Sequence, residues 1–256
     1  MAERGVALTP SRIIRLQTVE STQSVAFDLA SQGAADRTVV VAEHQTAGRG
    51  RRGHHWQDEP GANLLFSIIV RSSLPLARRP LLSFAAAVAV AEALAEVARV
   101  DARLKWPNDV LVADRKVAGI LLESRSAATG SEPAGLAPTI IGIGVNVTQS
   151  RFDPELAGLA TSVVLENGRS VPRDELLDVL LDHFDRWRAR LEKEGFAPVR
   201  ERWLVLADTI GREVRVDGQM GLAVGLDEDG ALLLRDAGRT HRVVAGTATS
   251  RGGDRD

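Results

Sequence analysis

Apolar positions in the first part of the chain switch between the periods of strands and helices. Short apolar runs predict strands at residues 12–16, 38–43 and 63–71. Residues 24–32 have helical spacing, and Ser21-Thr22-Gln23 is placed to cap that helix. A long apolar helix is predicted from Pro80 to about residue 97. Because its apolar positions are nearly continuous, this helix is expected in the core.

The middle of the chain predicts more strands and then helices. Short turns join the next strand-like segments, which favours an antiparallel meander of residues 102–106, 110–113, 116–124 and 139–147. Residues 126–138 are rich in alanine, glycine, serine and proline, which is typical of an exposed hairpin loop. Helical spacing returns at 172–193 and 198–206, where it closes a large domain.

After Gly211 the pattern changes to short runs in which apolar and polar residues alternate. These runs lie at residues 213–216, 222–226, 231–235 and 241–245. We therefore predict a large domain over residues 1–207, a small β-barrel over 208–250 and a disordered tail over 251–256. The fold class is α+β, with a mixed, mainly antiparallel sheet flanked by helices.

Composition narrows the classes of partner. The formal net charge of −2 provides no broad basic field, so nucleic acid is disfavoured as the main partner. The absence of cysteine excludes disulfides and a thiol nucleophile. The N-terminus has no apolar signal core, and the most apolar stretch, residues 81–91, is expected to be too short to span a bilayer. These features predict a cytoplasmic protein that does not bind membranes.

Two short segments carry the candidate chemistry. Gly48-Arg49-Gly50-Arg51-Arg52-Gly53 alternates glycine with guanidinium groups, so backbone N–H donors and positive charge can converge on a phosphate. Lys105-Trp106-Pro107-Asn108-Asp109 supplies an ammonium and a carboxylate beside a turn. Lysine is scarce here, since only Lys105, Lys116 and Lys193 occur among 32 basic residues. This scarcity suggests that a compact ammonium is needed at the first two positions.

Each feature also has a plain interpretation. Residues 48–53 could form a basic loop that touches RNA or only solvent, and Pro107-Asn108-Asp109 is ordinary turn chemistry. Trp106 is expected in the core whatever the function. Other candidates have equally ordinary readings: Lys116 as a solvated hairpin residue, Ser21 and Thr22 as a helix cap, and Asn146 as a satisfied core amide.

The two segments fall in register with others. Together with Glu20-Ser21-Thr22-Gln23, Trp56, residues 115–123 and residues 142–147, they resemble the ordered motifs of biotin protein ligases from roughly residue 14 to 150. The resemblance implies the class II aminoacyl-tRNA synthetase/biotin ligase catalytic fold with a small C-terminal SH3-like barrel. Because it begins close to Met1, it suggests the monofunctional type, which lacks an N-terminal DNA-binding domain and represses no operator.

The resemblance also implies a reaction. Biotin and ATP, with Mg²⁺, would give biotinyl-5'-AMP and pyrophosphate, and the biotinyl group would then pass to a lysine of a biotin carboxyl carrier protein or domain of an acyl-CoA carboxylase. Lipoate and octanoate ligases share the fold and the adenylate chemistry, so they remain the alternative. A nucleic-acid-binding protein is the rival from another class. Monomer and homodimer both stay open.

Residue roles follow from the same resemblance. The catalytic set is Lys116, Lys105, Arg51 and Asp109. The biotin-binding set is Ser21, Thr22, Gln45, Gly48, Arg49, Lys116 and Gly119. The ATP-binding set is Arg49, Arg51, Trp56, Lys105, Asn108, Asp109 and Asn146. Asp109 could ligate Mg²⁺ or accept a proton from the acceptor lysine, and the sequence leaves that choice open. His54 and Gln23 depart from the family pattern and receive no role.

Overall fold

The computed structural model describes residues 12–124 and 137–250. The predicted tail at 251–256 lies outside the described residues. So does the predicted loop at 126–138, except for residues 137 and 138.

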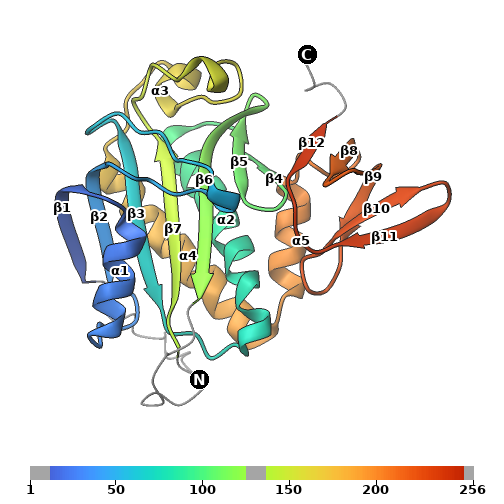
Figure 1. The fold of residues 1–256 in the computed structure, drawn as a ribbon, viewed down its shortest axis with the longest axis horizontal. Helices are drawn as coiled ribbons and strands as arrows, with labels where there is room; N and C mark the ends of the chain where they lie inside the picture. Colours follow the sequence, from blue (N-terminus) through green and yellow to red (C-terminus); the bar gives the residue numbers. More distant parts are fainter. Residues whose placement is uncertain (1–11, 125–136, 251–256) are drawn as a thin grey trace, which may run out of the picture.

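A sheet of seven strands forms the centre of the molecule (Figure 1). Its order is β1-β2-β3-β7-β6-β5-β4. The strands are β1 (Ile13–Val19), β2 (Val39–Gln45), β3 (Asn63–Val70), β4 (Arg103–Lys105), β5 (Asp109–Val112), β6 (Arg115–Ser124) and β7 (Thr139–Asn146). Only β1 and β2 pair in parallel; the other described neighbours are antiparallel. This confirms the mixed, mainly antiparallel sheet and the meander from β4 to β7.

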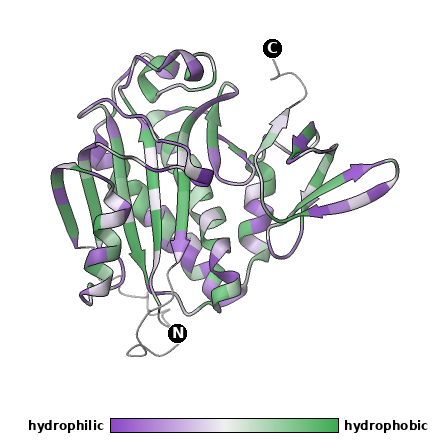
Figure 2. Cartoon of the chain, in the orientation of Figure 1, coloured by the Kyte–Doolittle hydropathy of each residue, from purple (hydrophilic) through white to green (hydrophobic). Residues whose placement is uncertain are grey.

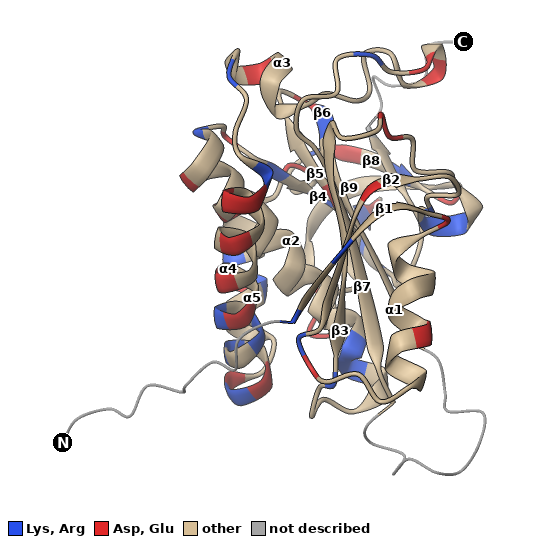
Figure 3. Ribbon diagram, turned by 90° about the vertical axis from the view of Figure 1, so that its left-hand side faces the viewer, with Lys and Arg blue, Asp and Glu red and all other residues tan. Residues whose placement is uncertain are grey.

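Helices cover both faces of the sheet. Helix α1 (Thr22–Ser31) packs on one face, whereas α2 (Leu82–Ala93), α4 (Arg173–Glu194) and α5 (Ala197–Leu206) pack on the other, as the side view shows (Figure 3). Successive side chains of β2 alternate between these layers. Val39 and Val41 belong to the large core under α2 and α4, while Val40 packs with Phe27 of α1. Strand β3 is buried at every position and almost entirely apolar because both of its faces are covered.

Helix α2 is the most apolar of the longer helices, and nearly all of its side chains are buried; Figure 2 colours the chain by hydropathy. A 3₁₀ turn (Leu76–Leu81) leads into it and a π turn (Leu94–Ala98) follows it. The whole helical segment, Leu76–Ala98, has 23 residues and is long and apolar enough to cross a membrane, but 72% of its most apolar window is buried inside the protein. The expectation that this stretch is too short to span a bilayer is therefore wrong. Burial in the core accounts for its composition.

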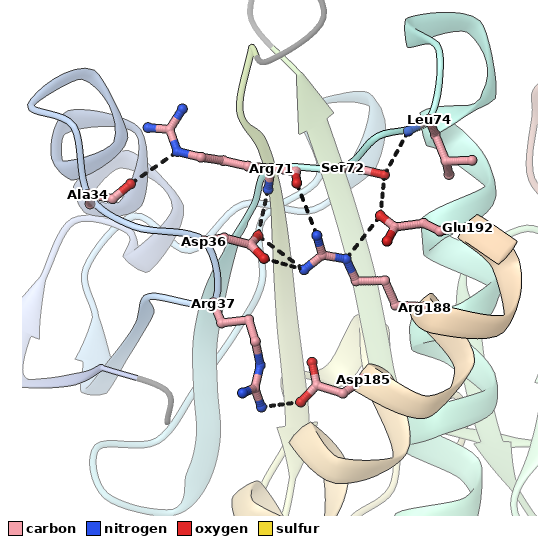
Figure 4. A network of polar contacts seen from close by, with 9 residues as sticks. All are labelled: Ala34, Asp36, Arg37, Arg71, Ser72, Leu74, Asp185, Arg188 and Glu192. Carbon is pink, nitrogen blue, oxygen red and sulfur yellow. Dashed lines mark hydrogen bonds and ion pairs between the residues drawn. The ribbon is translucent and has the colours of Figure 1, made fainter. Parts of the chain in front are cut away.

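An ionic network joins α4 to residues just before β2 and just after β3 (Figure 4). The guanidinium of Arg188 donates to both carboxylate oxygens of Asp36, at 3.0 and 2.8 Å, and to the carbonyl of Arg71 at 3.0 Å. Its Nε donates to Glu192 at 3.1 Å. Next to this cluster, Asp185 pairs with Arg37. Burial raises the pKa of Asp185, although Arg37 opposes that shift.

A short helix, α3 (Val163–Asn167), was not predicted. Five residues are too few to display helical periodicity. Only the residues that flank this helix give a signal in the sequence. Ser162 precedes it, and Gly168 ends it in the left-handed region at φ 71°.

The C-terminal strands form a second, antiparallel sheet in the order β11-β10-β9-β8-β12. They are β8 (Glu213–Val216), β9 (Gln219–Leu226), β10 (Leu232–Asp236), β11 (Arg239–Val243) and β12 (Ala248–Ser250). The predicted small β domain is confirmed. Its described strands pair as an open sheet, compatible with an SH3-like fold, and not as the closed barrel that was expected. The short strand β12 was also missed.

Side chains and backbone dock the small sheet on the large domain. The indole N–H of Trp106 donates to the carbonyl of Gly230 at 3.0 Å, and Arg200 donates to the carbonyl of Leu226 at 2.7 Å. A Cβ atom added to Gly230 would lie 2.7 Å from the ring of Phe84 in α2, so the turn packs closely there. Trp106 is fully buried, which confirms its predicted core position.

Candidate active site

A cavity opens on the α1 face of the sheet, where α1 begins. Across β6 and β7, Gly119 pairs with Gly144 and Leu121 pairs with Gly142. Directly opposed residues share a face, so the three glycines leave a floor of bare backbone. The cavity is lined by Ser21, Thr22, Gln23, Gln45, Arg49, Gly50, Arg51, Trp56, Phe66, Asn108, Lys116, Gly119, Ile120, Leu121, Gly142, Ile143 and Gly144.

One end of the cavity is polar and rigid. Ser21 is the N-cap of α1, and its hydroxyl accepts from the backbone N–H of Gln23 at 3.3 Å. The backbone N–H of Thr22 donates to Gln45 Oε1 at 2.8 Å. The hydroxyl of Thr22 lies 2.8 Å from the hydroxyl of Ser67. All of these side chains are buried. The capping interpretation is therefore confirmed for Ser21, and the same hydroxyl also lines the cavity.

Gln23, which departs from the family pattern and was assigned no role, also belongs to this polar end. Its Nε2 donates to the carbonyl of Leu121 at 3.1 Å, which leaves its Oε1 above Gly142. The longer amide thus reaches the floor of the cavity. Sequence reasoning also missed Gly142 and Gly144 as lining residues. Their spacing of two within a strand was a usable signal, because it puts both on one face.

Lys116 and Asp109 bring two sequence motifs together. Lys116 Nζ lies 2.7 Å from Asp109 Oδ1, across the antiparallel pair β5 and β6. The backbone of Lys116 is fixed as well: its N–H donates to the carbonyl of Leu159 at 2.8 Å, and its carbonyl accepts from Thr161 at 2.9 Å. The ammonium is thus held at the edge of the glycine floor.

The indole of Trp56 lies over that floor. A Cβ atom added to Gly144 would lie 2.6 Å from the ring, and one added to Gly119 would lie 3.0 Å from it. Lys116 Nζ is 5.6 Å from the ring centroid, within range of a cation–π contact. Trp56 Nε1 is buried and has no hydrogen-bond partner within the described part of the chain. The indole therefore offers a ring face and a free donor to a ligand.

The Gly-Arg loop, defined as residues 48–53, covers the cavity. Arg51 donates to Asn108 Oδ1 at 3.0 Å, while Asn108 donates to the carbonyl of Ile120 at 2.8 Å. Burial lowers the pKa of Arg51, although Asp109 opposes that shift. Arg49 donates to Glu123 at 2.7 Å, and both side chains are more than one-third exposed. Arg51 is thus the half-buried cation of the loop, and Arg49 is an exposed one at its rim.

Four predicted site residues are not among those that line this cavity: Gly48, Lys105, Asp109 and Asn146. The carbonyl of Gly48 accepts from the backbone N–H of Trp56 at 2.9 Å. Lys105 ends β4 opposite Asp109, and its charge acts on Asp208. Asn146 is buried and donates to the carbonyl of Thr161 at 2.9 Å; its Oδ1 has no partner among the residues that the structure describes. Asn146 is therefore only half satisfied as a core amide. His54 is exposed, and its backbone closes the turn of the loop by accepting from Gly50 at 2.7 Å.

Metal ligands were tested against the same geometry. In the described ranges, no group of three histidine, aspartate or glutamate side chains could hold a metal ion. The carboxylate of Asp109 already contacts Lys116. Among the described residues, side chains alone therefore do not form a metal site.

Comparisons with known proteins agree with this geometry. Residues 15–146 match the biotin/lipoate A/B protein ligase family, and residues 209–248 match the biotin protein ligase C-terminal domain. The chain is 40% identical to a biotin–acetyl-CoA-carboxylase ligase of Paracoccus denitrificans, over 88% of this chain and 95% of that protein. The enzyme of that name from Mycobacterium tuberculosis is 36% identical, over 91% and 87%.

A solved structure shares the whole architecture. The biotin protein ligase from Aquifex aeolicus in complex with biotin and ATP matches with a TM-score of 0.80 and 28% identity, covering 94% of this chain and 98% of that one. The chain therefore belongs to the biotin/lipoate A/B protein ligase family, and within it carries the C-terminal domain of the biotin protein ligases.

Proposed function

We propose that this protein is an ATP-dependent biotin protein ligase of the cytoplasm. It activates biotin as biotinyl-5'-AMP, releases pyrophosphate, and transfers the biotinyl group to a lysine of a biotin carboxyl carrier domain of an acyl-CoA carboxylase. The observation that carries the choice of biotin is the polar end of the cavity, formed by Ser21, Thr22, Gln23 and Gln45.

The polar end matches the ureido ring of biotin. That ring has two N–H donors and one carbonyl acceptor, whereas the tails of lipoate and octanoate have neither. Hydroxyls and amides in the cavity can both donate and accept. A site built to hydrogen-bond a ligand rejects an analogue that leaves its buried polar groups unpaired. The alternative acids are therefore disfavoured by chemistry, and the matched C-terminal domain also favours biotin.

In the first step a carboxylate oxygen of biotin attacks the α-phosphorus of ATP. A new O–P bond forms, and the bond to pyrophosphate breaks. Two anions must approach one another, so fixed positive charge lowers the barrier. Lys116 would face the biotin carboxylate, and Arg51 would face the phosphate that reacts. Their positions are set in advance by Asp109 and Asn108, respectively.

Mg²⁺ would enter with the nucleotide. It usually binds through substrate phosphates with few protein ligands, and it supplies charge neutralisation there. We assign Asp109 to holding Lys116, because Oδ1 of its carboxylate lies 2.7 Å from the ammonium. The sequence left open whether Asp109 ligates Mg²⁺ or accepts a proton from the acceptor lysine, and neither role is part of this proposal.

In the second step the amine of the acceptor lysine attacks the acyl carbon of the adenylate. The C–N bond forms as the bond to AMP breaks, and one amine proton passes to solvent. Lys116 would stabilise the developing negative charge on the acyl oxygen. Trp56 and the Gly-Arg loop would shield the mixed anhydride from water.

A nucleic-acid-binding role fits less well. Each arginine of the Gly-Arg loop has an acceptor within the protein: Arg49 has Glu123, Arg51 has Asn108 and Arg52 has Asp217. Their charges are therefore engaged locally and do not form a free basic surface. Salt-sensitive RNA binding without ATP turnover would support that role instead.

Pyrophosphate exchange into ATP tests the function. We would compare biotin, lipoate and octanoate with no added acid, in the presence of Mg²⁺. We expect exchange with biotin alone. Exchange with lipoate or octanoate would reassign the cavity, and no exchange with any acid from folded protein would refute the ligase proposal.

A further inference from the structure

Arg52 has no part in the chemistry above, yet it makes a specific contact with the C-terminal domain. Its guanidinium forms two parallel hydrogen bonds with the carboxylate of Asp217, Nη1 to Oδ1 and Nη2 to Oδ2, both at 2.7 Å. The two residues are 165 positions apart. The backbone of Arg52 lies in the left-handed region at φ 56°, which is uncommon for a residue with a side chain. Bidentate pairing of this kind sets orientation as well as distance.

The partner side of this contact is a tight hairpin turn. Asp217 and Gly218 join β8 to β9 with φ angles of 47° and 88°, the positive pair that a type I′ turn requires. The turn is held against Gly246, where an added Cβ atom would lie 2.3 Å from Val216 Cγ1. The carbonyl of Gly246 accepts from Arg51 Nη1 at 3.2 Å. Adjacent points of the C-terminal domain therefore contact two consecutive arginines of the loop.

We propose that the Arg52–Asp217 pair is a latch by which the C-terminal domain holds the Gly-Arg loop over the cavity. Arg52 and Asp217 are positioning residues in this view, and they act through Arg51. The inference rests on the proposed ligase function. It assigns to the C-terminal domain a role in retaining ATP and the adenylate at a site built by the larger domain.

The physical character of the pair suits a reversible latch. The side chains of Arg52 and Asp217 are 51% and 44% exposed, so water and salt screen their attraction. A buried pair would resist opening, whereas an exposed one can break when ligand enters and form again when it is bound. Closure of the Gly-Arg loop also positions Arg51, because its hydrogen bonds to Asn108 and to the Gly246 carbonyl both require the loop in this position.

The test uses the full chain with Arg52→Ala, Asp217→Ala and the charge-reversed double variant Arg52→Asp with Asp217→Arg. We would measure KM for ATP and kcat in pyrophosphate exchange, and the rate at which biotinyl-5'-AMP escapes from the enzyme. Each single variant should raise KM for ATP and the escape rate by about two- to fivefold, the range expected for an exposed pair. The reversed pair should recover most of that loss, and the differences should shrink at high salt.

Arg190→Ala is the matched control, because this arginine pairs with Glu194 and is 47% exposed on α4. It should leave KM and the escape rate unchanged. If the wild type exchanges pyrophosphate and both single variants keep its KM for ATP and its escape rate at low salt, the latch is refuted. The ligase function is then unaffected. Wild-type protein that exchanges no pyrophosphate with biotin would instead refute the function itself, and the latch with it.

Discussion

The ammonium of Lys116 lies 2.7 Å from the carboxylate of Asp109, on the neighbouring strand of the main sheet. Each residue comes from a different sequence motif, and the antiparallel pairing of β5 with β6 brings them together. The contact does two things. It partly neutralises a cation at the edge of the glycine floor, and it fixes the direction in which that cation can donate.

Loss of the ammonium should remove most of the first half-reaction. We predict that Lys116→Ala lowers the rate of biotin-dependent pyrophosphate exchange by about 10²- to 10³-fold, the cost typical of removing one group that stabilises developing charge. Lys193→Ala is the control, since Lys193 lies in the last turn of α4. The thermal unfolding midpoint of both variants should stay near that of the wild type. Exchange at the wild-type rate in Lys116→Ala would remove Lys116 from its role.

The glycine floor should tolerate no side chain beneath Trp56. A Cβ atom at Gly144 would approach the indole to 2.6 Å, so Gly144→Ala must displace the ring from its place. We expect a rise in KM for ATP of about tenfold, consistent with the loss of one aromatic contact. Gly225→Ala in β9 is the control, because an added Cβ meets nothing within 4 Å there. Unchanged KM in Gly144→Ala would show that the indole is not part of the binding site.

The network around Arg188 should contribute to stability and not to catalysis. Arg188→Met leaves the partly exposed carboxylates of Asp36 and Glu192 without their buried partner, so we predict a loss of about 1.5–3 kcal/mol in the free energy of unfolding. Arg190→Met removes only an exposed ion pair with Glu194 on the same helix. It should change the free energy of unfolding by less than about 0.5 kcal/mol. Urea unfolding of both variants measures the difference. Equal losses would contradict the assignment.

Asp208 should make stability depend on pH. Burial raises the pKa of its carboxyl, although Arg212 opposes that shift. The folded state therefore binds this proton more tightly than the unfolded state, and the wild type loses stability as pH rises from the unfolded pKa of about 3.9 through the folded pKa. Asn carries no such charge. We predict that the stability of Asp208→Asn relative to wild type increases over that pH window and is constant above it.

Urea unfolding at a series of pH values checks the prediction for Asp208. Asp114→Asn serves as the control, since Asp114 contacts the same Arg212 from an exposed position. A stability difference for Asp208→Asn that stays constant between about pH 3 and 7 would mean that its titration is not coupled to folding.

Most elements of the fold could be predicted from local pattern. The helix over α2, the amphipathic α4 and the hairpins of the meander are each recorded in the spacing of nearby residues, because periodicity follows from the geometry of a single element. The elements that were missed, α3 and β12, are too short to show a period. The length argument against a membrane span also failed, since only burial distinguishes a core helix from a spanning one.

The site divides in a similar way. Motif order brought the resemblance to biotin protein ligases, which the family match confirms, and it pointed to residues that do line the cavity, such as Lys116 and Arg51. It also assigned Lys105 to the site; Lys105 pairs with Asp109 across β4 and β5 but does not line the cavity, so its role stays a prediction.

The sequence by itself determined the strands and helices, the two-part organisation and the class of chemistry, because these depend on residue type and local spacing. The tertiary structure decided that β7 inserts between β3 and β6, that glycines from two strands form one floor, and that Asp217 reaches Arg52. Such relationships join residues far apart in the chain. They arise only when burial of apolar surface selects one packing, and no local pattern records that selection.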